Sequence, residues 1–220
     1  MSVATVESPP IETLEELIDR LGSVGLDRIR LVPPPGTATK QDVLDVHDKT
    51  NRLFELVDGV LVEKAMGFYE SRIANALIGI VEGFLRQNDI GITVGADGMM
   101  QLAPGLVRMP DVAFLSWDKF PNREIPEDPI PELAPDLAVE VLSLSNTRAE
   151  TERKTREFFE AGVRLVWIMD PRKKMVDVYT SPDEFKTLHE DDSLDGGDVL
   201  PGFALPIQEW FERAGKWGGH

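Results

Sequence analysis

The sequence predicts an α/β fold in which a mixed β-sheet is flanked by helices. Three patterns lead to this class: a helical apolar stripe over residues 68–86, several short apolar segments after it, and the apolar run 137–142, which precedes a further helix and strand. A run as apolar as 137–142 is typical of a central strand covered on both faces. With 220 residues, 42% of them apolar, the chain can bury a full core.

The overall composition limits the classes of function. Lys and Arg number 23 against 39 Asp and Glu, which gives a formal net charge of -16. This charge repels polyanions at long range, so it disfavours loose binding to nucleic acid and favours a divalent cation in an acidic cleft or a basic partner. The chain has no cysteine, which excludes disulfides, thiolate zinc sites and cysteine nucleophiles.

The sequence also bears on location in the cell. No run of about 18 apolar residues occurs, and the N-terminus lacks the basic start and apolar core of a secretory signal. The lack of cysteine fits a reducing compartment. We therefore expect a cytoplasmic protein that does not associate with membranes.

We expect three regions along the chain. Residues 1–36 form a leader, with a disordered start at 1–10, a short amphipathic helix that ends at Gly22, and a Pro-rich linker. Residues 37–213 form the main domain, and residues 214–220 form a flexible tail.

The elements of the main domain follow from changes in hydrophobic period and from turn residues. Helices are expected at 39–49, 68–86 and 147–161, and at the C-terminal end up to about 213. Strands are expected at 53–57, 60–64, 91–95, 98–103, 107–115, 136–142, 165–169 and 175–179, with a Pro-rich loop at 121–135. Asp58 and Gly59 form a tight turn between the first two strands.

Glu140 is the most informative single residue. Five of the six positions from Leu137 to Leu142 are apolar, and the sixth is this carboxylate. Burial of an unpaired charge is costly, so the position points to a function. The alternative is a charge that reaches solvent at the end of the strand or pairs with a basic side chain.

Asp111 and Lys154 are the next candidates. Asp111 follows Pro110, which keeps the chain extended at the start of an apolar strand, and its alternative role is that of an ordinary turn residue. Lys154 lies four residues before Phe158 and so shares the inward stripe of its helix, and its alternative is a lysine whose stem reaches solvent. Together with Glu140, these residues form one chemical unit.

Two carboxylates at neighbouring strand ends can hold Mg²⁺ or Mn²⁺ and leave positions for water and phosphate. The ion would polarise a phosphate oxygen and lower the pKa of a bound water, while Lys154 would stabilise charge on the attacking water or on the phosphate. This set predicts hydrolysis of a phosphodiester. Glu55, in the first hairpin strand, and Glu70, in the first turn of the long helix, are weaker candidates, since either could be a solvated or helix-dipole carboxylate.

Several segments occur in the order found in a known family. They are FELVDG at 54–59, Pro110-Asp111, PDLAVEVLS at 135–143, KTREFFEAGV at 154–163, GVRLVWIMDP at 162–171 and LPGFALP at 200–206. As an ordered set, over about residues 37–212, they resemble the PD-(D/E)XK nuclease superfamily. Within it they resemble the Uma-type family of putative restriction endonucleases, which is abundant in cyanobacteria and other bacteria.

The resemblance implies a restriction-endonuclease-like αβββαβ core and a magnesium- or manganese-dependent DNA endonuclease. It implies Asp111 and Glu140 as metal ligands and Lys154 as a catalytic lysine displaced to the helix, with Glu55 as an accessory acidic residue. Leu142 stands where a strict ExK motif has its lysine.

A second departure lies at the start of the long helix. Family members often carry His there, where this chain has Tyr69-Glu70-Ser71.

Two alternatives to a DNA endonuclease remain at this point. One is a catalytically silent module that keeps the nuclease fold for protein interaction, which the acidic surface and the extra N-terminal helix favour. The other is a nuclease for RNA or branched DNA, which would use the same chemistry. A homodimer is the arrangement that would bring two sites to the two strands of a duplex.

Overall fold

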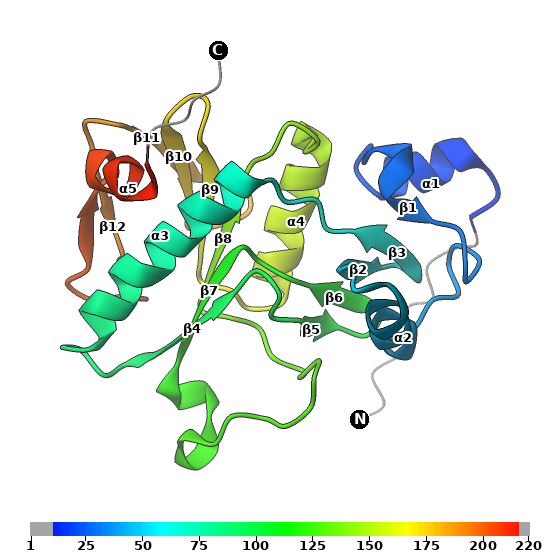
Figure 1. Ribbon diagram of the computed structural model, residues 1–220, viewed down its shortest axis with the longest axis horizontal. Helices are drawn as coiled ribbons and strands as arrows, with labels where there is room; N and C mark the ends of the chain where they lie inside the picture. The colour runs from blue at the N-terminus through cyan, green and yellow to red at the C-terminus, as the bar shows by residue number, and fades with distance from the viewer. Residues whose placement is uncertain (1–10, 216–220) are drawn as a thin grey trace.

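The structure, a computed structural model that describes residues 11–215, contains two principal β-sheets with helices packed against them (Figure 1). The larger sheet has six strands, which lie in the spatial order β11 (Phe185–His189), β10 (Met175–Tyr179), β9 (Leu165–Asp170), β8 (Leu137–Val141), β7 (Val112–Ser116) and β4 (Gly91–Gly95). Strands β8 and β9 run parallel, and all other neighbours in this sheet run antiparallel. The mixed sheet predicted from the sequence is therefore confirmed.

The smaller sheet has five strands and lies beside the larger one. Its spatial order is β1 (Ile29–Arg30), β3 (Val60–Glu63), β2 (Phe54–Val57), β6 (Leu106–Arg108) and β5 (Met100–Ala103). The predicted hairpin of β2 and β3 is present, and both of its turn residues have the positive φ that such a turn requires, 50° at Asp58 and 71° at Gly59. A short ribbon of β12 (Ser193–Asp195) and β13 (Ala204–Pro206) completes the strands.

Two helices cover opposite faces of the larger sheet. Helix α3 (Phe68–Leu85) crosses one face (Figure 1), where its apolar stripe packs with Val139 and Trp167, and α5 (Ile207–Ala214) lies beside it. Helix α4 (Arg148–Glu160) covers the other face, where Phe158 packs with Ala138. Because side chains alternate along a strand, Glu140 shares the α4 face with Ala138.

The prediction of a single strand over 107–115 is wrong, because this segment contains parts of two strands. Residues up to Arg108 belong to β6 of the smaller sheet, and residues from Val112 belong to β7 of the larger one. The linking residues Met109, Pro110 and Asp111 carry the chain from one sheet to the other. Pro110 has no N–H to donate to a ladder, so it marks the point where pairing in the first sheet stops.

The N-terminal segment packs on the smaller sheet. The predicted short helix is present as α1 (Leu14–Arg20), and Leu17 and Leu21 contact Val60 and Val62 of the sheet. After α1 come a 3₁₀ turn, Leu26–Arg28, and β1, which pairs with β3.

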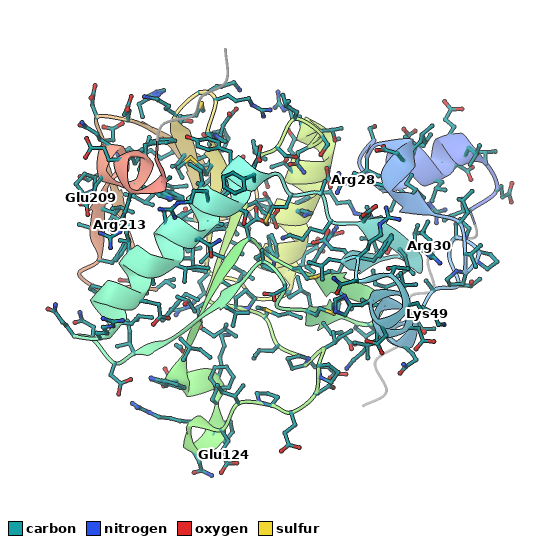
Figure 2. All side chains as sticks on the ribbon, in the orientation of Figure 1. Arg28, Arg30, Lys49, Glu124, Glu209 and Arg213 are labelled. Atoms are coloured by element: carbon teal, nitrogen blue, oxygen red, sulfur yellow. The ribbon has the colours of Figure 1, made fainter. Side chains whose placement is uncertain are left out.

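Arg28 attaches this segment to α4 (Figure 2). Its guanidinium donates hydrogen bonds of 3.0 Å and 2.8 Å to the two carboxylate oxygens of Glu150, and both side chains are buried. Residues 11–36 are thus packed against the main domain. The domain boundaries expected after residues 36 and 213 remain predictions. The expected disordered start, 1–10, and most of the expected tail, 216–220, lie outside the described residues.

The remaining predicted elements agree with the structure to within a few residues. Helix α2 (Lys40–Thr50) begins after Thr39, and α4 begins after Thr147, whose hydroxyl accepts the Glu150 N–H at 3.0 Å. The short strands β1, β11, β12 and β13 were not predicted. No helix in the described part of the chain has the length and apolar character needed to cross a membrane.

Candidate active site

A buried group of charged side chains lies where the two sheets meet α4. It draws Glu55 from β2, Asp111 from the linking segment, Glu140 from β8 and Lys154 from α4. Their exposed fractions are 0%, 4%, 7% and 4%, so each is nearly excluded from solvent. The alternative interpretations of Glu55, Glu140 and Lys154 as solvent-reaching charges are therefore wrong, although Glu140 does pair with a basic side chain.

Lys154 connects the two sheets through carboxylates. Its Nζ lies 3.2 Å from Glu140 Oε2 in the larger sheet and 3.3 Å from Glu55 Oε2 in the smaller one. The inward position of Lys154 on α4, four residues from Phe158, brings the ammonium onto the α4 face of β8. Lys154 therefore occupies the place that its helical spacing predicts.

Glu55 is held by further donors from the end of β6 and from the linking segment after it. Arg108 Nη1 donates to Glu55 Oε2 at 2.7 Å, and the Met109 backbone N–H donates to Glu55 Oε1 at 3.2 Å. Arg108 is fixed in turn by Glu157 of α4, which accepts its Nε–H at 2.9 Å. Both oxygens of Glu55 thus have partners, and the carboxylate is fixed in one orientation.

Asp111 is oriented by the backbone of β8. Its Oδ2 accepts the Val141 N–H at 2.7 Å, and its own N–H donates to the Val139 carbonyl at 2.9 Å. The other oxygen, Oδ1, lies 2.7 Å from the ammonium of Lys64, which also donates a hydrogen bond to the Met109 carbonyl. Asp111 is therefore an ordered residue next to the end of β8 and not a solvated turn residue.

The electrostatics of Glu140 differ from those of its neighbours. Burial raises the pKa of Glu140 to about 7, and the nearby Asp111 carboxylate contributes to the rise, although Lys154 opposes it. Glu140 Oε1 is buried and has no hydrogen-bond partner among the described residues. This carboxyl group therefore carries an unsatisfied oxygen and changes charge close to neutral pH.

Glu55 and Lys154 remain charged for a common reason. Burial alone would raise the pKa of Glu55, but the positive charges of Lys154 and Arg108 hold it below its usual range. Burial alone would lower the pKa of Lys154, but Glu140 and Glu55 hold it above its usual range. The cluster thus contains a fixed positive charge beside one ionised and one titrating carboxyl group.

The cluster fits a divalent cation by the nature of its donors. Mg²⁺ is commonly bound by one or two carboxylates, with waters and substrate phosphates as further ligands. Asp111 and Glu140 supply two such carboxylates, and Glu140 Oε1, which accepts no hydrogen bond from the described residues, is free to act as a ligand. Glu55, the third carboxylate of the cluster, already has partners on both oxygens, and residues 11–215 contain no group of three or more His, Cys, Asp or Glu suited to a metal.

Four of the five acidic and basic residues singled out from the sequence come together. The exception is Glu70, whose carboxylate lies over Gly67 at the start of α3, where a Cβ on Gly67 would be 2.2 Å from Glu70 Oε2. Among the described contacts none joins Glu70 to Asp111 or Glu140, and its accessory role remains a prediction.

Three members of the cluster were not identified from the sequence: Lys64, Arg108 and Glu157. The one available signal was at Arg108, a charged residue inside an apolar segment. Lys64 follows Glu63 at the end of an apolar run, where a charged residue is expected to reach solvent. Glu157 lies next to Arg156 in a highly charged helix, so neither position indicates burial.

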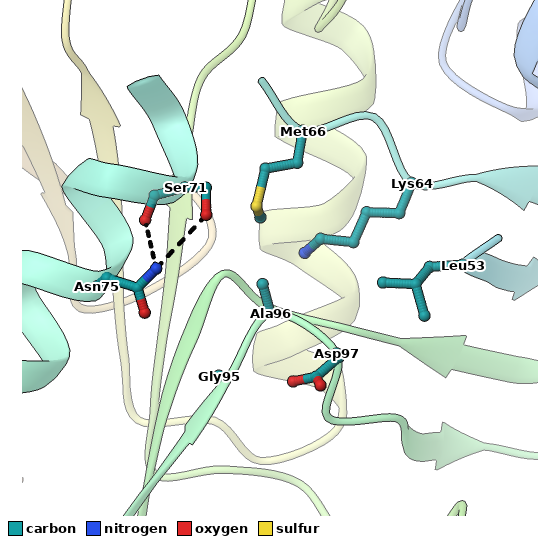
Figure 3. A pocket seen from close by; sticks show the side chains of 8 residues that line it. All are labelled: Leu53, Lys64, Met66, Ser71, Asn75, Gly95, Ala96 and Asp97. Carbon is teal, nitrogen blue, oxygen red and sulfur yellow. Dashed lines mark hydrogen bonds between the residues drawn. The ribbon is translucent and has the colours of Figure 1, made fainter. Parts of the chain in front are cut away.

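A pocket of about 270 Å³ adjoins Lys64 (Figure 3). It is lined by Leu53, Lys64, Met66, Ser71, Asn75, Gly95, Ala96 and Asp97. Figure 3 shows Lys64 extending from one wall, with Ser71 and Asn75 of α3 on the opposite side. The long lysine side chain thus borders both the carboxylate cluster and an open space.

Comparisons with known proteins agree with this architecture. A family model described as Uma2, putative restriction endonuclease, matches residues 41–208. A crystal structure of a putative nuclease belonging to DUF820, from Anabaena variabilis ATCC 29413, superposes with a TM-score of 0.67 at 20% sequence identity, and the match covers 78% of this chain and 98% of that one. A search of curated proteins gave no match.

The family match spans more than half of the chain, and the structural match supports the same restriction-endonuclease-like fold, with α3, β4, β7, β8, α4 and β9 as its αβββαβ core. The chain therefore belongs to the Uma2 family of putative restriction endonucleases.

Proposed function

We propose that this protein is a divalent-metal-dependent endonuclease that hydrolyses phosphodiester bonds of DNA. The observation that carries the proposal is the buried cluster in which Glu140 of β8 pairs with the ammonium of Lys154, while Asp111, just before the adjacent strand β7, is hydrogen-bonded to the backbone of β8. A structural core gains little from such a group, because replacing a buried ion pair with apolar residues is often neutral or stabilising.

Asp111 and Glu140 are the residues that would hold Mg²⁺ or Mn²⁺. When bound, the ion supplies Lewis-acid polarisation of a phosphate oxygen and a water of lowered pKa. The hydrogen bond from the Val141 N–H sets the orientation in which Asp111 would hold the ion. Glu140 must be ionised to act as a ligand, and its pKa of about 7 places that step near neutral pH.

Lys154 would supply the positive charge that the reaction requires. Phosphodiester hydrolysis builds negative charge on the phosphoryl oxygens, and a preorganised ammonium in a water-poor site stabilises that charge strongly. Glu55 fixes the position of Lys154, and Arg108 fixes Glu55. We therefore assign Glu55 and Arg108 as positioning residues.

Two basic side chains that follow β9 lie near the end of β8, where they could attract a polyanion. Arg172 Nη2 donates at 3.3 Å to the backbone carbonyl of Ser143, three residues beyond Glu140. The side chain of Lys173, next along the chain, is 70% exposed, and because both cations pair with the one carboxylate of Asp170, one positive charge remains in excess. Local positive charge of this kind supports phosphate contacts in spite of the net charge of -16.

One observation favours the second candidate, a catalytically silent nuclease-fold module. Lys64 lies 2.7 Å from Asp111 Oδ1, an oxygen that a metal would need. In that case the lysine would neutralise the carboxylate in place of a metal, the cluster would have no catalytic role, and the protein would act by binding other proteins.

Calorimetric titration with Mn²⁺ separates the two candidates. The proteins compared are the wild type, Glu140→Gln and the matched control Asp136→Asn, which alters a buried, cation-paired carboxylate next to the other end of the same strand. For a nuclease, the wild type and Asp136→Asn bind Mn²⁺ and Glu140→Gln does not. A nicking assay on supercoiled plasmid then shows Mn²⁺-dependent cleavage that Glu140→Gln lacks.

Absence of Mn²⁺ binding by the wild type, both with and without DNA, contradicts the nuclease proposal and favours the silent module. Binding without cleavage of DNA, but with cleavage of RNA or branched DNA, moves the proposal to those substrates.

A further inference from the structure

We infer that Lys64 is an internal cation that occupies Asp111 until a divalent metal displaces it into the neighbouring pocket. The inference rests on the proposed metal-dependent function and adds a residue to it. It gives the pair of Lys64 and Asp111 a role in the working site, where the silent-module interpretation would see only a neutralised carboxylate.

The position of Lys64 is well defined by its contacts. It follows β3 directly, and its backbone N–H donates to the Leu53 carbonyl at 2.9 Å, so the base of the side chain is fixed by the sheet. Its ammonium lies 2.7 Å from Asp111 Oδ1 and also donates to the Met109 carbonyl. The side chain is only 5% exposed, so this ammonium is held within the protein.

Lys64 and a metal need the same oxygen. Asp111 Oδ2 is engaged by the Val141 N–H at 2.7 Å, which leaves Oδ1 as the oxygen available to a cation. An ammonium and a divalent ion at that oxygen would repel each other strongly in a buried setting. Metal binding therefore requires that Lys64 move.

The structure provides space for the movement. Lys64 lines the pocket of about 270 Å³, and the four-carbon stem of a lysine has enough rotatable bonds to redirect the ammonium. Ser71, on the opposite wall, and Asp97 also line that pocket (Figure 3), and the Ser71 hydroxyl and the Asp97 carboxylate can both accept hydrogen bonds from the ammonium. The displaced ammonium would therefore not be left without partners.

The first test is Mn²⁺ titration of Lys64→Met at about pH 8.5, where free carboxyl groups are fully ionised. The matched control is Lys40→Met, which removes a lysine from a similar ion pair, 2.8 Å from Asp128, at a partly exposed site. We expect Lys64→Met to bind Mn²⁺ about tenfold more tightly than the wild type, because no ammonium has to be displaced. Lys40→Met should match the wild type.

The second test uses the wild-type protein and does not depend on the folding of a variant. Lysines are labelled with a limiting amount of acetic anhydride, with and without saturating Mn²⁺, and the labelled sites are quantified by mass spectrometry. The labelling of Lys64 should rise by about threefold or more with Mn²⁺, because the released ammonium becomes accessible. Lys40 should be labelled equally in both samples.

The outcomes separate this inference from the proposed function. Equal or weaker Mn²⁺ affinity in folded Lys64→Met, or unchanged Lys64 labelling while Mn²⁺ is bound, overturns the role of Lys64 and leaves the metal site intact. Absence of Mn²⁺ binding by both the wild type and Lys64→Met overturns both proposals.

Discussion

Lys154 and Glu140 form an ion pair, with 3.2 Å between Nζ and Oε2, in a place where both side chains are almost excluded from solvent. The two residues come from consecutive elements, β8 and α4, but their pairing depends on the smaller sheet as well, because Lys154 also lies 3.3 Å from Glu55. One ammonium thus holds two carboxylates, and its removal has consequences that can be measured.

Replacing Lys154 with Met should destabilise the fold by about 3 to 5 kcal/mol, since it leaves buried carboxylates without their shared counter-ion. Urea denaturation measures the free energy of unfolding. The control is Lys174→Met, which breaks an exposed pair with Glu190 and should cost less than about 1 kcal/mol. Similar losses in the two variants would contradict the structural role of Lys154.

Glu140 predicts a particular dependence of stability on pH. Its folded pKa of about 7 lies above the usual value of 4.5, so the folded state binds its proton more tightly than the unfolded state. The stability that this proton provides is present below about pH 4.5 and is lost as the pH rises through about 7. Glu140→Gln removes this loss.

The measurement is urea denaturation of both proteins at about pH 5 and pH 8 in the presence of a metal chelator. Between these values the stability of Glu140→Gln relative to the wild type should rise by up to about 3 kcal/mol. Parallel pH profiles for the two proteins would refute the raised pKa.

Glu55→Gln tests the proposed positioning role without removing either of the proposed metal ligands. We expect the Mn²⁺ affinity to change by less than about threefold, because Asp111 and Glu140 remain. The cleavage rate at saturating DNA should fall by at least about tenfold, with little change in KM, because Lys154 loses one of its two anchors. A change in KM alone would argue against this role.

Arg28→Met should detach the N-terminal segment from α4. The buried pair with Glu150 has two hydrogen bonds, and loss of one partner from such a pair costs about 3 to 5 kcal/mol. Limited proteolysis should show faster cleavage within residues 11–36. The control Arg148→Met, whose side chain is 92% exposed in its pair with Glu152, should behave as the wild type, and equal cleavage of all three proteins would count against the attachment.

Most of the fold could be predicted because its elements have strong periodic patterns. Helix α3 carries a continuous apolar stripe, and β8 is almost wholly apolar. The missed strand β11, by contrast, has three clearly exposed residues among five, so its sequence lacks the pattern of a buried strand. The sequence of segment 107–115 predicts one strand because its residues are mostly apolar, although they belong to two different sheets.

The site was predicted in part for a related reason. Glu140 and Lys154 interrupt apolar patterns, and Glu55 does the same in FELV, so their sequences signal a buried charge. Lys64 has no such signal. Its partner Asp111 is 47 residues away, and their contact exists only because the linking segment passes beside the end of β3.

The passage of one chain segment between two sheets has a mechanical consequence. Glu55 belongs to the smaller sheet and Glu140 to the larger one, while Met109, Pro110 and Asp111 link the two. A slight rotation of one sheet against the other would pull the charges apart and leave every strand intact. On gradual heating, the proposed metal site should therefore be lost before the circular dichroism changes, because a shift of about 1 Å disrupts the arrangement of its charged groups but leaves the secondary structure intact.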